Sequence, residues 1–324
     1  MKNFFKKVGE WFQNHKPTKR RIIQLYAALL YNANIKGFIS GDIYKGATKN
    51  LCVPGMNCYS CPGAVGACPL GSLQNALYAS NSSTLAYIFG TLVLFGLLLG
   101  RTICGWLCPI GLGQELLYKI KTPKVKKNKV TRVFSYLKYV LLAVLVIIIP
   151  MTVFIPGFCE YICPAGTFQG GLGLLLQEER YATLAQLGPL FTWKFTVMIL
   201  VIVGSIFFFR FFCRFLCPLG ALYGFFCRIA VLGVKLDKNK CTDCGLCIAA
   251  CKMDIKRVGD HECIHCGECI KVCPAKAISW KAEKIFVRGN DVDAPVSTEM
   301  KPLSSMLKGK ETPTETEEIG RAHV

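Results

Sequence analysis

Four long runs of apolar residues occupy the first two thirds of the chain. Three of them are nearly free of charged residues and approach the roughly 20 residues that a helix needs to cross a bilayer, at 85–100, 139–155 and 195–212. The fourth, 22–39, is interrupted by Asn32, Asn34 and Lys36. An interfacial helix or an uncleaved signal-like segment is the alternative for it. With this run taken as a span, the pattern predicts an α-helical membrane protein with four transmembrane helices.

The distribution of charge predicts the orientation of these helices. The chain carries 39 Lys and Arg against 20 Asp and Glu, a formal net charge of +19, which alone would suggest nucleic acid or an anionic membrane as partner. The basic residues gather in the leader 1–21 and the loop 101–138, whereas the loops 40–83 and 156–192 contain few. Because Lys and Arg are enriched on the cytoplasmic side, we expect a multi-pass protein of the cell membrane with both termini in the cytoplasm. The bilayer then accounts for most of the basic excess, and we expect no nucleic acid partner.

The predicted membrane domain contains an internal repeat. Arg101–Gly111 aligns with Arg210–Gly220, with Arg, both Cys, Leu, Pro and Gly in register, and Cys68–Gln74 aligns with Cys163–Gln169. Each half therefore reads as a span, an outer Cys-Pro-x-Gly motif, a second span and an inner Cys-x3-Cys-Pro-x-Gly motif. Both halves enter the membrane from the same side, so this duplicated two-span unit is a parallel repeat about an axis along the membrane normal. Such symmetry would bring the matching cysteines together.

These patterns divide the chain into four regions. We expect a basic cytoplasmic leader at 1–21, a four-helix membrane domain with Cys-Pro loops at 22–235, a small α+β ferredoxin module at 236–290 and a tail at 291–324. The tail is polar and repetitive, so we expect it to be disordered. The final residues 319–324 match the translation of a common sequencing adapter. We suspect that they are an artefact and that the natural C-terminus is missing.

Cysteine carries most of the chemistry, because the chain contains nineteen of these residues. Two runs of Cys-x2-Cys-x2-Cys-x3-Cys follow each other in the ferredoxin module, and in two-cluster ferredoxins the last cysteine of each run binds the cluster of the other run. The predicted ligands of the first 4Fe-4S cluster are Cys241, Cys244, Cys247 and Cys273. Those of the second cluster are Cys263, Cys266, Cys269 and Cys251. A pair of zinc knuckles is the alternative, and thiolate ligands predict a reducing compartment for this region in either case.

Three neighbouring residues depart from a simple ferredoxin pattern. Lys252 follows Cys251 where proline is usual, which we expect to change loop geometry or potential without removing a ligand. His265 lies between two ligands, and we expect it to be a solvent-facing loop residue and not a ligand. We expect Cys227 to have no partner and to be inert.

The inner Cys-x3-Cys-Pro motifs predict a further iron-sulfur cluster. A proline directly after a cysteine suits the first turn of a helix, which places the cysteine at the cap, where free N–H groups stabilise an anionic thiolate cluster. The two motifs together supply the four thiolates of one cubane, from Cys104, Cys108, Cys213 and Cys217. Packing thiols at helix ends are the alternative. Arg101 and Arg210 precede the two pairs and either balance the charge of the cluster or anchor to lipid headgroups.

The outer loops contain six cysteines, more than one cluster needs. Symmetry favours Cys68, Cys159 and Cys163 together with one of Cys58 or Cys61, and leaves Cys52 as the spare residue. One or two disulfides are the alternative, because an exported loop meets an oxidising environment. We therefore expect one or two further iron-sulfur clusters in the membrane domain, in addition to the two of the ferredoxin module.

The sequence contains no motif for haem or nucleotide binding. None of the four histidines lies in a predicted span, and the chain has no Cys-x-x-Cys-His motif, so we expect no haem. A phosphate-binding glycine loop is also missing from the sequence, which argues against nucleotide hydrolysis. Trp106 and Trp193 are expected to anchor helices at the membrane interface and not to line a quinone pocket.

The twin Cys-x3-Cys-Pro motifs after membrane spans, followed by a two-cluster ferredoxin motif, resemble the NapH/NosR-type membrane-bound polyferredoxins from about Arg20 to Trp280. The loop 52–69 resembles that of a subgroup of this family. The resemblance implies electron transfer across or along the membrane, often between quinol and an exported reductase, with an FMN-bearing or ferredoxin-like partner. This chain lacks the large exported flavin domain of NosR, and a related family handles copper, so the resemblance alone does not select respiration.

We therefore expect an electron-transfer protein between a cytoplasmic partner or the quinone pool and an exported redox partner. It would serve as a subunit of an oxidoreductase, with a quinol dehydrogenase as one option. The alternatives are a redox-dependent metal-handling or assembly factor for a respiratory enzyme, and a scaffold that docks a soluble reductase. The hydrocarbon core is about 30 Å thick, and clusters at its two surfaces would exchange electrons poorly. Either the Cys-Pro helices dip into the bundle, or another cofactor bridges the two surfaces.

Overall fold

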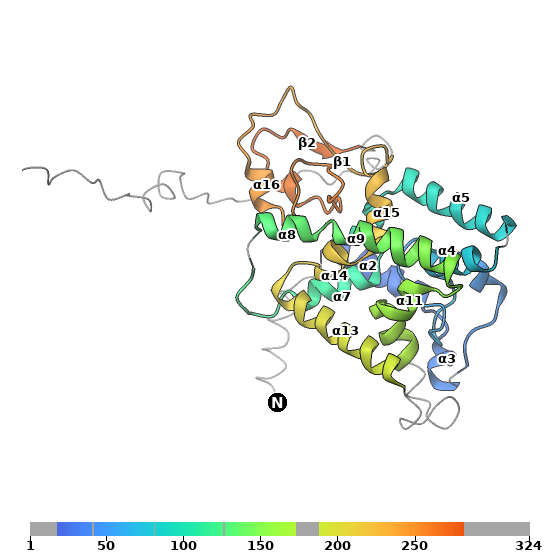
Figure 1. Cartoon of the computed structure of the whole chain (residues 1–324). Helices are drawn as coiled ribbons and strands as arrows, with labels where there is room; N and C mark the ends of the chain where they lie inside the picture. Colours follow the sequence, from blue (N-terminus) through green and yellow to red (C-terminus); the bar gives the residue numbers. More distant parts are fainter. Residues whose placement is uncertain (1–17, 41, 81, 126, 173–187, 282–324) are drawn as a thin grey trace, which may run out of the picture. The chain divides into compact units, whose positions relative to one another are not determined.

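The computed structural model describes residues 18–281, apart from 41, 81, 126 and 173–187 (Figure 1). The disordered tail and most of the basic leader that the sequence predicts lie outside the described residues. The described part is mostly helical and has one small two-stranded sheet.

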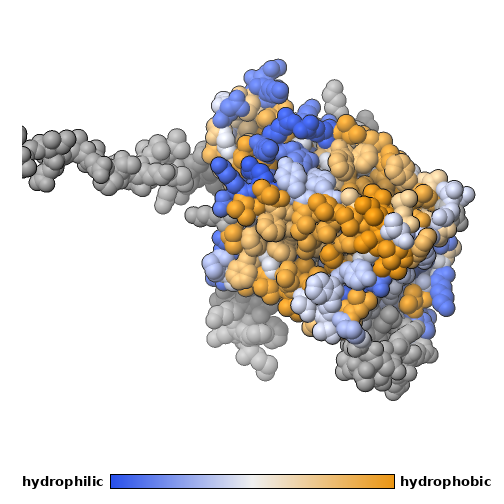
Figure 2. Space-filling model, in the orientation of Figure 1, coloured by the Kyte–Doolittle hydropathy of each residue, from blue (hydrophilic) through white to orange (hydrophobic). Residues whose placement is uncertain are grey.

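Two helices have the length and apolar composition to cross a membrane, Lys129–Thr152 and Pro189–Phe207. The first consists of α8 (Lys129–Phe134), α9 (Leu137–Leu141), the π-helical segment η2 (Leu142–Ile148) and α10 (Ile149–Thr152), and the second is α13 (Pro189–Phe207). A third apolar helix, α5 (Ser82–Leu98), has 17 residues. Figure 2 shows hydrophobic residues gathered over the long green helix α8–α10 of Figure 1, where Val133, Val140 and Met151 are exposed.

The first predicted span is two helices, α2 (Lys19–Tyr31) and α3 (Ile35–Ser40). The asparagines between them explain the break, because amide side chains compete for backbone hydrogen bonds. Asn32 Nδ2 donates to the carbonyl of Ala28 at 2.9 Å, and Asn34 Nδ2 donates to the carbonyl of Pro62 at 2.9 Å. Of the four predicted spans, two correspond to helices with the length and composition to cross a membrane. The other two are not confirmed.

Short helices connect the long ones and reveal the repeat. Each Cys-x3-Cys-Pro motif forms one turn of helix, a break at the second cysteine and then a longer helix. The elements are α6 (Thr102–Trp106) and α7 (Pro109–Leu117) in the first half, and α14 (Phe211–Phe215) and α15 (Pro218–Phe226) in the second. The outer loops contribute η1 (Ala47–Asn50), α4 (Pro69–Tyr78), α11 (Gly157–Tyr161) and the π-helical η3 (Gly166–Gly171).

The C-terminal module is built from two short helices and two short strands. Strand β1 (Val234–Leu236) pairs antiparallel with β2 (Ile278–Trp280), with Val234 opposite Trp280. The helices are α16 (Leu246–Ala250) and α17 (Glu268–Lys271). Val234, Val258 and Ile278 form a small core under the sheet.

The module packs directly on the Cys-x3-Cys-Pro helices. A Cβ atom on Gly105 would lie 2.2 Å from the carbonyl oxygen of Ile264, so only glycine allows α6 to approach the module this closely. Trp106 Nε1 donates to the carbonyl of His265 at 2.9 Å, and its ring makes an edge contact with Trp280. Trp106 therefore contacts the ferredoxin module, and its role as an anchor at the membrane interface stays a prediction. Trp193 is 55% exposed.

Candidate iron-sulfur sites

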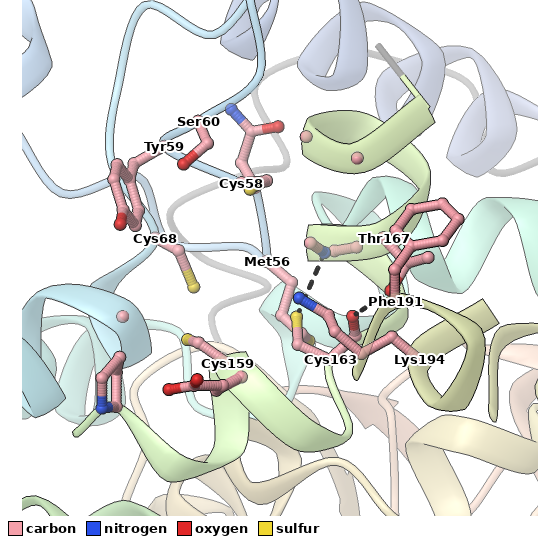
Figure 3. A pocket seen from close by; sticks show the side chains of 18 residues that line it. Met56, Cys58, Tyr59, Ser60, Cys68, Cys159, Cys163, Thr167, Phe191 and Lys194 are labelled. Atoms are coloured by element: carbon pink, nitrogen blue, oxygen red, sulfur yellow. Dashed lines mark hydrogen bonds between the residues drawn. The ribbon is translucent and has the colours of Figure 1, made fainter. Parts of the chain in front are cut away.

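Four cysteines from the two loops that the sequence predicts on the outer side surround one cavity of about 310 Å³, which we call the first site (Figure 3): Cys58, Cys68, Cys159 and Cys163. Lys194 from α13 also lines this cavity and supplies a positive charge beside the thiols. Cys61, the sequence alternative to Cys58, is not among the lining residues, and its sulfur contacts the Oδ1 atom of Asn32 at 3.7 Å. Cys52 lines a different pocket.

The cysteines of the two inner motifs meet in the second site: Cys104, Cys108, Cys213 and Cys217. All four are buried, and the space that they enclose is about 10 Å³, enough for about one water molecule. Met56 lines both the first and the second site. No feature of the sequence singled out Met56, because its position depends on the path of an irregular loop.

The ferredoxin module contains the remaining two sets. The third site is a cavity of about 370 Å³ whose lining includes Cys251, Cys263, Cys266 and Cys269. The fourth set is Cys241, Cys244, Cys247 and Cys273, of which Cys247 and Cys273 pack on the same small core. Cys244 is exposed, whereas the other eighteen cysteines, all of them within the described residues, are buried or half-buried. None of the nineteen forms a disulfide.

Three of the cysteines that precede a proline stand at the start of a helix. Cys68, Cys108 and Cys217 are the N-cap residues of α4, α7 and α15, with extended backbone and proline in the first turn. Free backbone N–H groups then point at the sulfur atoms: the amide of Gly220 donates to Cys217 Sγ at 3.3 Å, and that of Gly166 donates to Cys163 Sγ at 3.4 Å. These donors favour an anionic thiolate over a neutral thiol.

The two arginines that precede the inner motifs are fully buried, so their anchoring to lipid headgroups is excluded. Arg210 forms an ion pair with Glu115, Nη2 to Oε1 at 2.7 Å. Arg20 of α2 forms a second ion pair with the same carboxylate. Arg101 pairs with Glu262 of the module, Nη1 to Oε2 at 2.9 Å. Glu262 also pairs with buried Lys138. Burial alone would raise the pKa of Glu262, but the two cations lower it to about 2.

Two further predictions about single residues are wrong. His265 is fully buried instead of solvent-facing, and Cys227 has a partner, since its sulfur lies 3.1 Å from His265 Nε2. The backbone N–H of Val234 donates to His265 Nδ1 at 2.9 Å, so the proton of the neutral ring is on Nε2 and points at the sulfur. Burial, with Lys281 and Arg101 nearby, lowers the pKa of His265 to about 4. The thiol of Cys227 in turn contacts the carbonyl of Cys263 at 3.3 Å, which ties α15 to the third site.

These sites fit iron-sulfur clusters by donor type. The first and third sites each combine four thiols with a cavity. The second site has four thiols and, beside them, the buried guanidinium of Arg101, whose Nε and Nη2 atoms have no hydrogen-bond partner. Gly220 lines the second site, and a Cβ atom added to it would lie 3.4 Å from Arg101 Nη2. The unpaired Nη2 group is therefore beside this site. An anionic cluster suits such unpaired donors. The space in the second site is smaller than a cubane, so its cysteine side chains would have to change position for a cluster to bind. Within the described residues, no group of three His, Cys, Asp or Glu side chains could hold a single metal ion.

Comparison with known proteins agrees with this chemistry. The model of a 4Fe-4S binding domain matches residues 84–128, 138–180 and 190–238, and a second 4Fe-4S binding domain model matches 259–279. No solved structure matches the chain.

Three relatives are informative. Protein MJ0749 of Methanocaldococcus jannaschii is 32% identical over 200 residues, covering 59% of this chain and 68% of the relative. YccM of Escherichia coli, named as a candidate electron transport protein, is 24% identical over 59% of this chain and 54% of its own. The methylamine utilization ferredoxin-type protein MauN of Methylorubrum extorquens is 27% identical over 56% of this chain and 59% of its own.

The domains and the relatives define an iron-sulfur protein of the electron-transfer class. Within that class, the chain belongs to the family of membrane-type polyferredoxins.

Proposed function

We propose that this chain is a membrane-bound electron conduit, with four 4Fe-4S clusters in the four cysteine sets, between a cytoplasmic redox partner and a partner on the opposite side of the cell membrane. The observation that carries this proposal is the position of Met56, whose side chain lines both the first and the second site. The sequence assigns the cysteines of these sites to opposite sides of the bilayer. A single shared side chain makes the two sites neighbours, which supports Cys-Pro helices that dip into the bundle over an additional bridging cofactor.

The same closeness continues into the module. Gly105, one residue after Cys104 of the second site, touches Ile264, one residue after Cys263 of the third site. The third and fourth sets are joined through α16, which holds Cys247 of the fourth set and is followed directly by Cys251 of the third. Each cysteine set is therefore a neighbour of the next one. Within this series, no two successive sets are separated by the thickness of a bilayer.

Iron-sulfur clusters, when bound, supply reversible one-electron chemistry at these four positions. The residues of the chain would hold the thiolates, bury the second set completely and balance charge. Lys194 stands at the first site, and Arg101 and Arg210 flank the second. Because a charge buried without compensation is costly, these cations favour loading of the sites with anionic clusters.

The exposed end of the series is the fourth set. Cys244 and its neighbours Leu246 and Ile248 are open to solvent, and an exposed ligand loop suits electron exchange with a soluble partner. We place this end and both termini in the cytoplasm, with α5, the helix Lys129–Thr152, α13 and the broken first segment as the membrane part.

Electron passage through sealed vesicles tests the proposal. The full chain with its clusters is reconstituted in liposomes that contain a redox dye, and an impermeant reductant is added outside. We expect the dye to be reduced with the native protein and not with the Cys159→Ser or Cys213→Ser variants. Cys52→Ser, which alters a cysteine outside all four sets, is the matched control and should behave as the native protein. Failure of the cluster-loaded native protein to reduce the dye would contradict the proposal.

A further inference from the structure

We infer that Gln74 and Gln114 are positioning residues that raise the reduction potentials of the first and second sites, each through an N–H bond to a thiolate. This inference rests on the proposed binding of clusters there. Both glutamines occupy the same place in their motifs, the sixth residue after the cysteine that precedes proline. Both side chains are buried, with 0% and 3% of their surface exposed.

The two glutamines reach a sulfur atom of the opposite half of the repeat. Gln74 Nε2 lies 3.2 Å from Cys159 Sγ in the first site. Gln114 Nε2 lies 3.1 Å from Cys213 Sγ in the second site. In each case the sulfur belongs to the first cysteine of a Cys-x3-Cys pair, and that pair lies in the second half of the repeat.

The orientation of each amide follows from its other contacts. Gln74 Oε1 accepts the backbone N–H of Phe158 at 3.0 Å, and Gln114 Oε1 accepts that of Phe212 at 2.8 Å. A backbone N–H can only donate, so the oxygen must face it and the NH2 group must face the sulfur. The second hydrogen of each NH2 group bonds the carbonyl four residues earlier, at Leu70 and Ile110. Every polar atom of both amides is therefore used, which fixes one N–H on the sulfur.

The two other residues at the same motif position do not touch sulfur. Gln169 accepts the backbone N–H of Cys58 at 2.9 Å and donates to Asn57 Oδ1 at 3.1 Å. Tyr223 donates to the carbonyl of Pro54 at 3.1 Å. The repeat thus supplies a natural comparison, since Gln169 shares the buried amide and the accepted backbone N–H of Gln74 but lacks its contact to sulfur.

The sign of the effect follows from charge. Reduction adds one negative charge to a cluster and its thiolates, and an N–H donor stabilises the more negative form most. The low dielectric of a buried site strengthens such a bond. Removing the donor should therefore make the cluster harder to reduce, and its potential should fall.

An EPR-monitored redox titration of the purified, cluster-loaded full chain tests the inference. Gln74→Leu should lower the potential of the first cluster and Gln114→Leu that of the second, each by on the order of 59 mV, which corresponds to a tenfold change for one electron. Gln74→Met and Gln114→Met keep the length of the side chain but have no N–H or O–H donor, so they should lower the same potentials. Gln169→Leu is the matched control, because it removes a buried amide that accepts a backbone N–H but does not contact sulfur. It should change the potential of the first cluster by much less than Gln74→Leu does.

Several outcomes would overturn the inference. Unchanged potentials in both the Leu and the Met variants would do so, as would an equal fall in Gln169→Leu. Loss of the cluster from both Gln74 variants but not from Gln169→Leu would assign Gln74 to cluster retention instead of potential. The iron content of the native protein separates these cases from the proposed function, because absence of iron from the first and second sites would contradict that function itself.

Discussion

The Sδ atom of Met56 lies 3.7 Å from the Sγ atom of Cys217 in the second site, while the same side chain borders the cavity of the first site. The loop that contains Met56 belongs to the predicted outer segment, and Cys217 belongs to a motif predicted on the cytoplasmic side. Their contact brings two cysteine sets that are far apart along the chain to adjacent positions. The path that we propose for electrons depends on this arrangement.

The choice of the fourth ligand in the first site gives a direct prediction. Cys58 lines the cavity of the first site, whereas the sulfur of Cys61 contacts Asn32 instead. We expect Cys58→Ser to lose the signal of one cluster and Cys61→Ser to keep it, as measured by EPR of the reduced protein and by iron analysis. A loss confined to Cys61→Ser would contradict the arrangement of the first site.

Gly105 controls the approach of the module to the second site. An alanine there would place its Cβ atom 2.2 Å from the carbonyl oxygen of Ile264, so the backbone must shift, at a cost of about 1–3 kcal/mol. We expect Gly105→Ala to lower thermal stability and slow electron exchange between the module and the remaining clusters, at unchanged iron content. Gly113→Ala is the control, since nothing lies within 4 Å of its added carbon, and helix propensity should make it neutral or stabilising. Equal behaviour of the two variants would contradict the tight contact.

Glu262 joins the module to the helices through buried ion pairs. Glu262→Gln leaves Arg101 and Lys138 without their carboxylate, and breaking a buried pair in this way costs about 3–5 kcal/mol. The pKa of Glu262 falls from 4.5 to about 2 on folding, so its contribution is complete above pH 4.5 and is lost only as the pH falls toward 2. Denaturation at pH 5 and at pH 6 should therefore show the same deficit for the variant. A deficit that disappears between these two pH values would mean that Glu262 titrates in that range.

The parts of the site that the sequence predicts are those that rest on repetition. A proline directly after a cysteine in the repeated motifs predicts a helix cap, and Cys68, Cys108 and Cys217 are N-cap residues. Symmetry between the halves predicts that the inner cysteines meet, and Cys104 and Cys213 line one site. Such features depend on local rules and on symmetry, both of which can be read along a chain.

The parts that the sequence does not predict depend on contacts between distant segments. His265 and Cys227 lie 38 residues apart, and neither has a local pattern that indicates burial, because each is covered only when the module docks on α15. The break of the first apolar run arises in the same way, since Asn34 bonds a loop carbonyl at Pro62. The position of Met56 likewise follows from a loop without regular structure.

Iron and acid-labile sulfide per chain, measured together with EPR of the reduced protein, test the central claim most directly. The account predicts about 16 irons per chain, from four cubanes, falling to about 12 in Cys159→Ser and in Cys213→Ser while the ferredoxin signals remain. About 8 irons in the native protein, unaffected by either substitution, would mean that only the ferredoxin module binds clusters and would contradict the conduit.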